Sequence, residues 1–144
     1  MVEAKKLDIN QICERIPHRY PLLMLDHAEI KDEMHISSVY RLTPEMSVFQ
    51  GHFPGNPMFP GVYLTEIMAQ TAAVLLLDPE EKRGLLPVLS AISKMRYYSP
   101  AKPGDTLNIC AKIIDRVQEM YSMEAAVQIE NRSVAAGELL MILK

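Results

Sequence analysis

The segment GVYLTEIMAQTAAVLLL, residues 61–77, limits more than any other what this chain can fold into. It lacks the alternation of apolar and polar residues that is typical of a strand, and it is rich in Leu, Met and Ala, so it predicts a helix of about four to five turns. Pro60 and Gly61 stand at its start and Pro79 lies beyond its end, as expected for helix boundaries. A helix that is apolar nearly all round must be enclosed on most sides by other elements.

The rest of the chain can supply that enclosure. Residues 7–16 predict a short N-terminal helix, with Asp8 as its N-cap and Pro17 as its stop. Segments of strand length follow, separated by polar turns: 22–30, 34–42, 86–99, 105–117, 119–130 and 133–144. Five or six mostly antiparallel strands curled around one central helix, at about 61–77, make an α+β fold. The sheet face away from the helix, and the sheet edges, would be available for a homodimer.

Length and composition place the chain among ordinary globular proteins. Its 144 residues fit a single domain, 1–144, and 49% are hydrophobic and 23% charged. The formal charge of −3, with no basic stripe interleaved with aromatic residues, argues against nucleic acid as a partner.

Cysteine usage and the apolar runs bear on location. Cys13 and Cys110 are isolated, with no metal-like spacing of His and Cys, and are interpreted as reduced thiols rather than as a disulfide or metal site. The N-terminus lacks the apolar core of a signal peptide, and the longest apolar run, 67–77, is too short to span a bilayer. We therefore expect a cytoplasmic protein without a membrane-inserted segment.

Glu66 is the one acidic residue in the long apolar segment, and Gln70 follows it one helical turn later. Burial disfavours the charged form of a carboxyl group, which would suit Glu66 to act as a general acid near neutral pH. The alternative is an ordinary hydrogen bond to Gln70 at the i, i+4 spacing, on a wet seam between protomers.

His52 lies in an unusual loop, QGHFPGNPMFPG, residues 50–61. Gly51 and Gly55 permit backbone angles closed to other residues, the prolines of the loop remove freedom, and together they can hold one side chain in a fixed place. A neutral imidazole whose other nitrogen is hydrogen-bonded is a ready general base. The alternative is a structural loop with an incidental histidine.

The start of the helix at Gly61 adds a third element. The first amides of a helix lack intrahelical partners, and a glycine there lets a substrate carbonyl approach the backbone closely. Glu66 lies five residues on, about 7–8 Å along the helix axis. A base, an acid and an oxyanion site suit proton abstraction α to a carbonyl, with loss of a β-substituent.

Three blocks of the sequence carry a family resemblance: PHRYPLLMLD (17–26), FQGHFPGNPMFPGVYLTEIMAQ (49–70) and MRYYSPAKPGD (95–105). They resemble the signature blocks of the FabZ-type (3R)-hydroxyacyl-acyl carrier protein dehydratases, hot-dog-fold enzymes of type II fatty acid synthesis. The resemblance runs from about Leu7 to the last predicted strand.

The resemblance implies a mechanism. His52 removes the α-proton, Glu66 assists departure of the β-hydroxyl as water, and the thioester carbonyl accepts a hydrogen bond from the Gly61 amide. The product is a trans-2-enoyl thioester, and no metal or redox cofactor is needed. In this family the histidine and the carboxylate come from opposite protomers, and the dimers commonly assemble as trimers of dimers, giving a hexamer. Glutamate at position 66 favours a plain dehydratase, with isomerase side activity left open.

Further residues are secondary candidates. Gln70 is expected to orient Glu66 or a water. An aromatic residue gates the acyl tunnel in relatives, and Tyr97 or Tyr98 is the candidate here, although a strand tyrosine also serves packing. Phe53, Met58, Phe59 and Ile67 could line the tunnel, but core packing explains each equally well. Ile67 stands where the family commonly has alanine, which bears on the preferred chain length. His18 is interpreted as a local capping or packing residue.

Acyl carrier protein is acidic, so basic residues are expected around the tunnel mouth. Lys94, Arg96 and Lys102 are the candidates, and a solvated charged face is the alternative. Two other functions stay open: a hot-dog acyl thioesterase, and a non-catalytic subunit that binds acyl carrier protein. The loop histidine argues against the first, since hydrolysis needs no α-proton base, and the presence of both His52 and Glu66 argues against the second.

Overall fold

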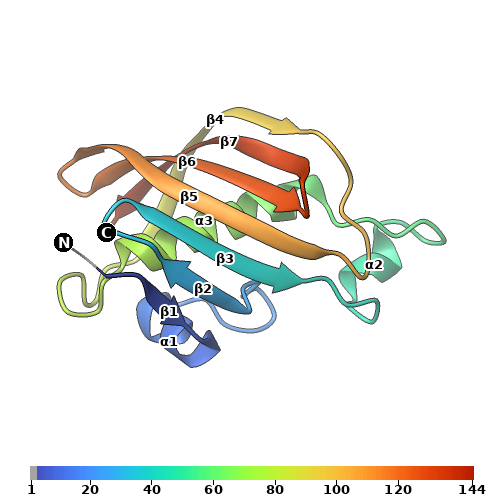
Figure 1. Cartoon of the computed structure of the whole chain (residues 1–144), viewed down its shortest axis with the longest axis horizontal. Coiled ribbons are helices and arrows are strands. Elements are labelled where there is room, and N and C mark those ends of the chain that lie inside the picture. The colour runs from blue at the N-terminus through green and yellow to red at the C-terminus, as the bar shows by residue number, and fades with distance from the viewer. Residues whose placement is uncertain (1–2) are drawn as a thin grey trace.

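A long helix, α3 (Gly61–Leu76), runs along one face of a seven-stranded sheet in the computed structural model, which describes residues 3–144 (Figure 1). The helix was predicted at 61–77 and differs by one residue at its C-terminal end. Eleven of its sixteen residues are buried, so the expected enclosure is confirmed. None of the helices in residues 3–144 combines the length and the apolar content needed to cross a lipid bilayer.

The sheet is antiparallel throughout, in the order β1-β2-β3-β5-β6-β7-β4. Its strands are β1 (Lys5–Leu7), β2 (His27–Ile30), β3 (His35–Arg41), β4 (Pro87–Tyr97), β5 (Thr106–Val117), β6 (Met120–Ile129) and β7 (Arg132–Leu143). Six of them correspond to the predicted strands. The seventh strand, β1, was not predicted. Its last residue, Leu7, was assigned to the N-terminal helix, but it belongs to β1, which pairs with β2.

Two short helices flank the sheet. α1 (Ile9–Arg15) begins with the predicted N-cap Asp8, which forms a capping box with Gln11, and it ends before Pro17. α2 (Val48–Gly51) was not predicted, because its four residues give no periodic pattern and its N-cap Ser47 makes no side-chain hydrogen bond. It takes up Gln50 and Gly51, which were assigned to the loop.

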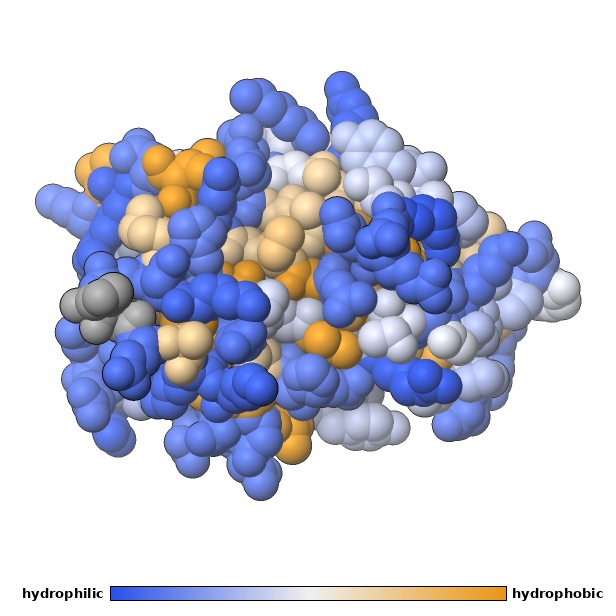
Figure 2. Space-filling view, in the orientation of Figure 1, coloured by the Kyte–Doolittle hydropathy of each residue, from blue (hydrophilic) through white to orange (hydrophobic). Residues whose placement is uncertain are grey.

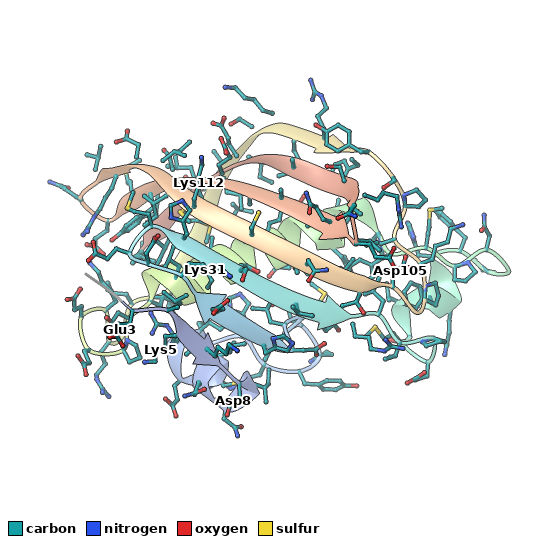
Figure 3. All side chains as sticks on the ribbon, viewed as in Figure 1. Glu3, Lys5, Asp8, Lys31, Asp105 and Lys112 are labelled. Carbon is teal, nitrogen blue, oxygen red and sulfur yellow. The ribbon has the colours of Figure 1, made fainter. Side chains whose placement is uncertain are left out.

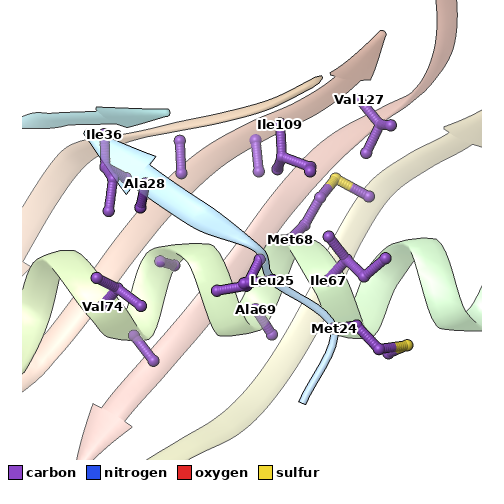
Figure 4. Packing of buried hydrophobic residues seen from close by; sticks show 14 of the residues in the cluster. Met24, Leu25, Ala28, Ile36, Ile67, Met68, Ala69, Val74, Ile109 and Val127 are labelled. Carbon is purple, nitrogen blue, oxygen red and sulfur yellow. The ribbon is translucent and has the colours of Figure 1, made fainter. Parts of the chain in front are cut away.

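The core lies between α3 and the inner face of the sheet. Ile67 and Met68 are fully buried, and Figure 4 shows them facing Ile109 of β5 and Val127 of β6. α3 contacts β3, β5, β6, β7 and β4, so the sheet curls around the helix as the enclosure argument requires. The α+β prediction is confirmed.

The outer face of the sheet and its two edges differ in character. Hydrophilic side chains cover much of the outer face, where apolar patches are scattered among them (Figure 2). One edge is the three-residue β1; the other is the eleven-residue β4, where Val88, Leu89 and Ile92 are exposed. The β4 edge is therefore a better candidate for self-association than the outer face that the sequence also suggested.

Candidate active site

His52 directly follows α2 and is held by the backbone on both sides. Its amide donates to the carbonyl of Val48 at 3.1 Å, and its own carbonyl accepts from the amide of Met58 at 2.8 Å. The neighbouring amide of Phe59 donates to the carbonyl of Ala101, which ties the loop to the turn before β5. Asp105, in that turn, lies at the same end of the molecule as α2 (Figure 3).

The imidazole of His52 is also oriented by its loop. Its Nδ1 lies 2.9 Å from the carbonyl oxygen of Met58, and a carbonyl can only accept, so Nδ1 carries the proton. The ring stacks on Phe53 with centroids 4.0 Å apart. Nε2 is then the unprotonated nitrogen, free to accept a proton, which is the state that the sequence argument required of a general base.

The loop closes through a tight turn between Phe53 and Asn56, whose amides and carbonyls bond to each other at 2.9 and 3.1 Å. Gly55 adopts a φ of +76° in this turn, a left-handed conformation that favours glycine. Gly51 does not: its φ is not positive, and a Cβ there would meet open space. The expectation that Gly51 supplies special backbone freedom was wrong, because Gly51 belongs to α2.

Glu66 lies one and a half turns into α3 and is one-third exposed in the single chain. The i, i+4 hydrogen bond that was the alternative to the general-acid interpretation is present, with Gln70 Nε2 donating to Glu66 Oε2 at 2.9 Å. Gln70 itself is fully buried and bonds to the backbone of Leu22 and Met24. Glu66 is therefore hydrogen-bonded to a side chain that the buried part of the fold holds in place.

His18 is a neighbour of Glu66 in the fold, although the two residues lie far apart in the sequence. Its Nε2 lies 3.7 Å from Glu66 Oε2, and its side chain is mostly buried. Burial lowers the pKa of the His18 imidazole; the charge of Glu66 opposes this shift and that of Arg19 adds to it. The interpretation of His18 as a local capping or packing residue did not include this contact, which spans 48 residues of sequence and which no local pattern signals.

Gly61 is the first residue of α3, and no hydrogen bond within residues 3–144 uses its amide. The amides of Tyr63 and Leu64 instead donate to the carbonyl of Pro60. A Cβ on Gly61 would lie 3.3 Å from the ring of Tyr97, so a side chain here would have to displace that ring slightly. The structure thus leaves one donor unused at the positive end of the helix.

His52 and Glu66 have separate sets of partners, and no hydrogen bond or ion pair joins them within residues 3–144. Two open cavities of the single chain lie elsewhere, one of about 500 Å³ along β1, β2 and β3, and one of about 800 Å³ at the C-terminal end of α3. Neither is lined by His52, Gly61 or Glu66.

The two candidate gate residues differ. The hydroxyl of Tyr97, at the end of β4, lies 2.6 Å from the hydroxyl of the buried Thr65 on α3. Tyr98, the next residue, is more than half exposed, and no side-chain hydrogen bond holds its hydroxyl within residues 3–144. Tyr97 is thus hydrogen-bonded to α3 at Thr65, the residue directly before Glu66. Thr65 was missed, because nothing in the sequence marks its partner.

The candidate tunnel residues also divide. Phe59 and Ile67 are buried in the core, and Phe59 packs against Phe49 and Tyr63. Phe53 is about half exposed and Met58 is half-buried, both beside His52.

The basic candidates Lys94, Arg96 and Lys102 are all exposed. Lys94 pairs with Glu138 of β7 at 3.4 Å, and the guanidinium of Arg96 donates to the carbonyl of Met95. As for metals, no three His, Cys, Asp or Glu side chains of residues 3–144 gather closely enough to hold an ion.

Comparison with known proteins identifies the family. Residues 28–138 match the ApeI-like family, described as ApeI dehydratase. The 3-hydroxyacyl-[acyl-carrier-protein] dehydratase FabZ of Caldicellulosiruptor saccharolyticus is 38% identical over 138 residues, which cover 95% of this chain and 99% of that protein. The FabZ of Streptococcus sanguinis is 37% identical, over 92% of this chain and 95% of that protein.

Solved structures agree on the fold. The dehydratase heterocomplex ApeI:P of Xenorhabdus doucetiae gives a TM-score of 0.79 at 17% identity, covering 92% of this chain and 90% of that chain. A hypothetical thioesterase of Streptococcus pneumoniae with coenzyme A gives 0.62 at 18% identity, covering 81% and 85%. The predicted hot-dog fold is confirmed, and by its identity to the FabZ proteins over nearly its whole length this chain belongs to the FabZ family of 3-hydroxyacyl-[acyl-carrier-protein] dehydratases.

Proposed function

We propose that this chain dehydrates (3R)-hydroxyacyl-acyl carrier protein to trans-2-enoyl-acyl carrier protein in type II fatty acid synthesis, with His52 as the base. The observation that carries the proposal is the hydrogen bond from His52 Nδ1 to the Met58 carbonyl. It leaves Nε2 able to take the α-proton, while two backbone bonds hold the residue in place.

Glu66 is the acid in this proposal. As the bond between C3 and its hydroxyl breaks, a proton from Glu66 leaves with the hydroxyl as water, and the electrons of the C2–H bond form the C2–C3 double bond. Return of a proton from His52 to Glu66 through solvent resets the site. Gln70 supports the role, because its hydrogen bond to Oε2 fixes the carboxyl group and leaves Oε1 for the substrate.

The Gly61 amide binds the thioester oxygen. Enolate character develops on that oxygen as the α-proton leaves, and a fixed N–H at a helix N-terminus stabilises the developing charge. No hydrogen bond within residues 3–144 occupies this amide, and Glu66 follows at a distance of about 7–8 Å along the axis. That distance allows one acyl chain to place its thioester carbonyl at the Gly61 amide and its β-hydroxyl near Glu66.

A homodimer completes the site, with His52 of one protomer facing Glu66 of its partner. The long apolar β4 edge supports this assembly, because unpaired strand edges with exposed Val88, Leu89 and Ile92 favour pairing with a second chain. The lack of contact between His52 and Glu66 within one chain supports it too. A trimer of dimers is the higher assembly that we propose.

The acyl chain enters past the two consecutive tyrosines at the end of β4. We assign the gate to Tyr97 or Tyr98 and the outer wall of the tunnel to Phe53 and Met58, which are accessible beside His52. Phe59 and Ile67 form the inner wall of the tunnel. Both are buried in the core, so the acyl chain contacts them only if the surrounding core side chains move. Lys94, Arg96 and Lys102 are exposed and meet the acidic carrier protein. A cytoplasmic location belongs to the proposal, as both Cys13 and Cys110 are free thiols.

One assay tests the activity against the thioesterase alternative. The protein is incubated with 3-hydroxyacyl carrier-protein thioesters, and enoyl absorbance and free thiol are followed together. Enoyl formation without thiol release is expected. Thiol release without enoyl formation would overturn the dehydratase, and neither product would indicate a non-catalytic subunit. Glu66→Gln is the matched control, since it keeps the shape of the side chain but removes the proton that it donates.

A further inference from the structure

The segment between α1 and β2 crosses α3 at the level of Glu66 and Gln70. Leu22 and Met24 of this segment bond to Gln70 through their backbone, and His18, earlier in the same segment, faces Glu66. One stretch of chain thus contacts both side chains. We propose that His18 is a positioning residue: with Gln70 it confines Glu66 Oε2 and leaves Oε1 as the oxygen that gives the proton to the departing hydroxyl. This inference rests on the proposed dehydratase reaction.

The position of His18 is fixed by its backbone. The guanidinium of the following residue, Arg19, donates to the carbonyls of Cys13, Ile16 and His18 itself at 2.7–3.0 Å. Ile16, just before, is buried in the core. The imidazole is therefore held where α1 ends, with only 18% of its side chain exposed.

The ring has one nitrogen with no use inside the fold. His18 Nδ1 is buried and has no hydrogen-bond partner among the described residues. Buried polar atoms are nearly always paired, and an unpaired one in a native protein calls for an explanation. The other nitrogen, Nε2, faces Glu66 Oε2. The ring is thus placed for its interaction with Glu66, at the cost of leaving Nδ1 unsatisfied.

The chemistry of the pair selects the tautomer. Burial lowers the pKa of the His18 imidazole against the opposing charge of Glu66, and Arg19 adds to the shift, which favours the neutral ring with a single proton. A proton on Nδ1 would bury an N–H without an acceptor and would turn the lone pair of Nε2 towards the carboxylate. A proton on Nε2 directs an N–H at Oε2 instead. The neutral ring thus presents a donor to Glu66.

The geometry at Oε2 then distinguishes the two carboxyl oxygens. Gln70 Nε2 donates to Oε2 at 2.9 Å. Gln70 cannot rotate away, because it is fully buried, its Nε2 also donates to the carbonyl of Leu22, and its Oε1 accepts from the amide of Met24. At 3.7 Å the His18 N–H is beyond hydrogen-bond length, and a shift of less than about 1 Å would bring it within range. The Gln70 donor disfavours a proton on Oε2, and the His18 N–H would strengthen this effect once within range, so the acidic proton resides on Oε1.

The experiment compares three substitutions in the full-length protein. His18→Leu removes the donor, His18→Gln keeps an N–H near the place of Nε2, and His27→Leu is the matched control on the exposed surface of β2. Turnover and KM are measured against pH with a 3-hydroxyacyl carrier-protein substrate. Circular dichroism and sedimentation check that fold and assembly are kept.

We expect His18→Leu to lower kcat about tenfold with KM changed less than about twofold, a fraction of the full value of general acid catalysis. The alkaline limb of its kcat profile should move to higher pH, because the carboxylate loses a stabilising donor. His18→Gln should keep at least about a third of wild-type kcat and an unshifted profile, since glutamine supplies the donor. His27→Leu should match the wild type.

Equal losses in His18→Leu and His18→Gln, or a change in KM alone, would overturn the inference and leave His18 a structural residue. If His18→Leu does not fold, His18→Asn replaces it, because its shorter amide does not reach Oε2. An inactive wild type would contradict the proposed function, whereas an active wild type with unaffected His18 variants would contradict only this inference.

Discussion

His52 and Glu66 are held in place by different kinds of contact. His52 is fixed by backbone atoms within six residues of it, those of Val48 and Met58. Glu66 is fixed by the side chain of Gln70, which is anchored to Leu22 and Met24, more than forty residues away in sequence. The proposed base, His52, therefore depends on a local loop, whereas the proposed acid, Glu66, depends on the packing of distant segments. Substitutions around the two residues should separate activity from stability in different ways.

The largest effect is expected from His52→Ala. Loss of the base should lower kcat by about 10²–10⁴-fold. The backbone bonds of the loop remain, so the melting temperature should stay near that of the wild type. Activity assays and thermal melts on the same preparation provide the check, and a collapse of the fold would show that the ring, not the backbone, holds the loop.

Gln70→Leu comes next and should affect both properties. The buried amide of Met24 would lose its acceptor, which costs about 1–3 kcal/mol of unfolding free energy, and the part-buried carbonyl of Leu22 would lose a donor. Turnover should fall about tenfold or more, because Glu66 loses its direct donor. Denaturant unfolding and kcat measure the two effects.

Thr71→Val is the matched control for Gln70→Leu. Thr71 is a fully buried polar residue on the same helix, and its hydroxyl contacts Ser38 and the carbonyl of Ile67 rather than Glu66. It should lower stability and leave kcat unchanged. If Thr71→Val lowered kcat as much as Gln70→Leu, general loosening of α3 would explain both results.

Gly55→Ala should have a smaller effect, confined to the loop of His52. Alanine in the left-handed conformation at this turn costs about 1–2 kcal/mol. The strain acts on the turn that positions His52, so we expect kcat to fall severalfold. Gly51→Ala, a few residues earlier, has open space for its Cβ and helical geometry and should be neutral. Similar losses in both variants would contradict the assignment of the strain to Gly55.

The smallest effect is a pH dependence of stability. Burial lowers the pKa of His18 in the folded state below its ordinary value of 6.5, so below that pH the unfolded chain binds a proton more readily. The contribution of neutral His18 to the free energy of unfolding is therefore present in full above pH 6.5, and it is lost as the pH falls through the pKa of His18 in the folded state. Urea unfolding measures this effect. Between pH 7 and 5 the free energy of unfolding should decline less for His18→Gln than for the wild type. Parallel plots of this free energy against pH for the two proteins would refute the prediction.

The same contrast explains what could be predicted from the sequence. The helix over 61–77, the N-cap Asp8, six strands, the loop of His52 and the Gln70–Glu66 bond all follow from residues near one another in the chain. The contact of His18 with Glu66 and that of Tyr97 with Thr65 depend on how distant segments pack, which no local pattern records. β1 and α2 were missed because elements of three and four residues carry too little periodicity.

The central claim is that one active site takes His52 from one protomer and Glu66 from its partner, and mixing of inactive variants tests it most directly. His52→Ala and Glu66→Gln are each purified as inactive dimers, mixed in equal amounts and allowed to exchange subunits. Random exchange makes half of the dimers mixed, each with one intact site of two, so recovery of about one quarter of wild-type activity is expected. No recovery after exchange has been verified would contradict the claim and place both residues in the same protomer.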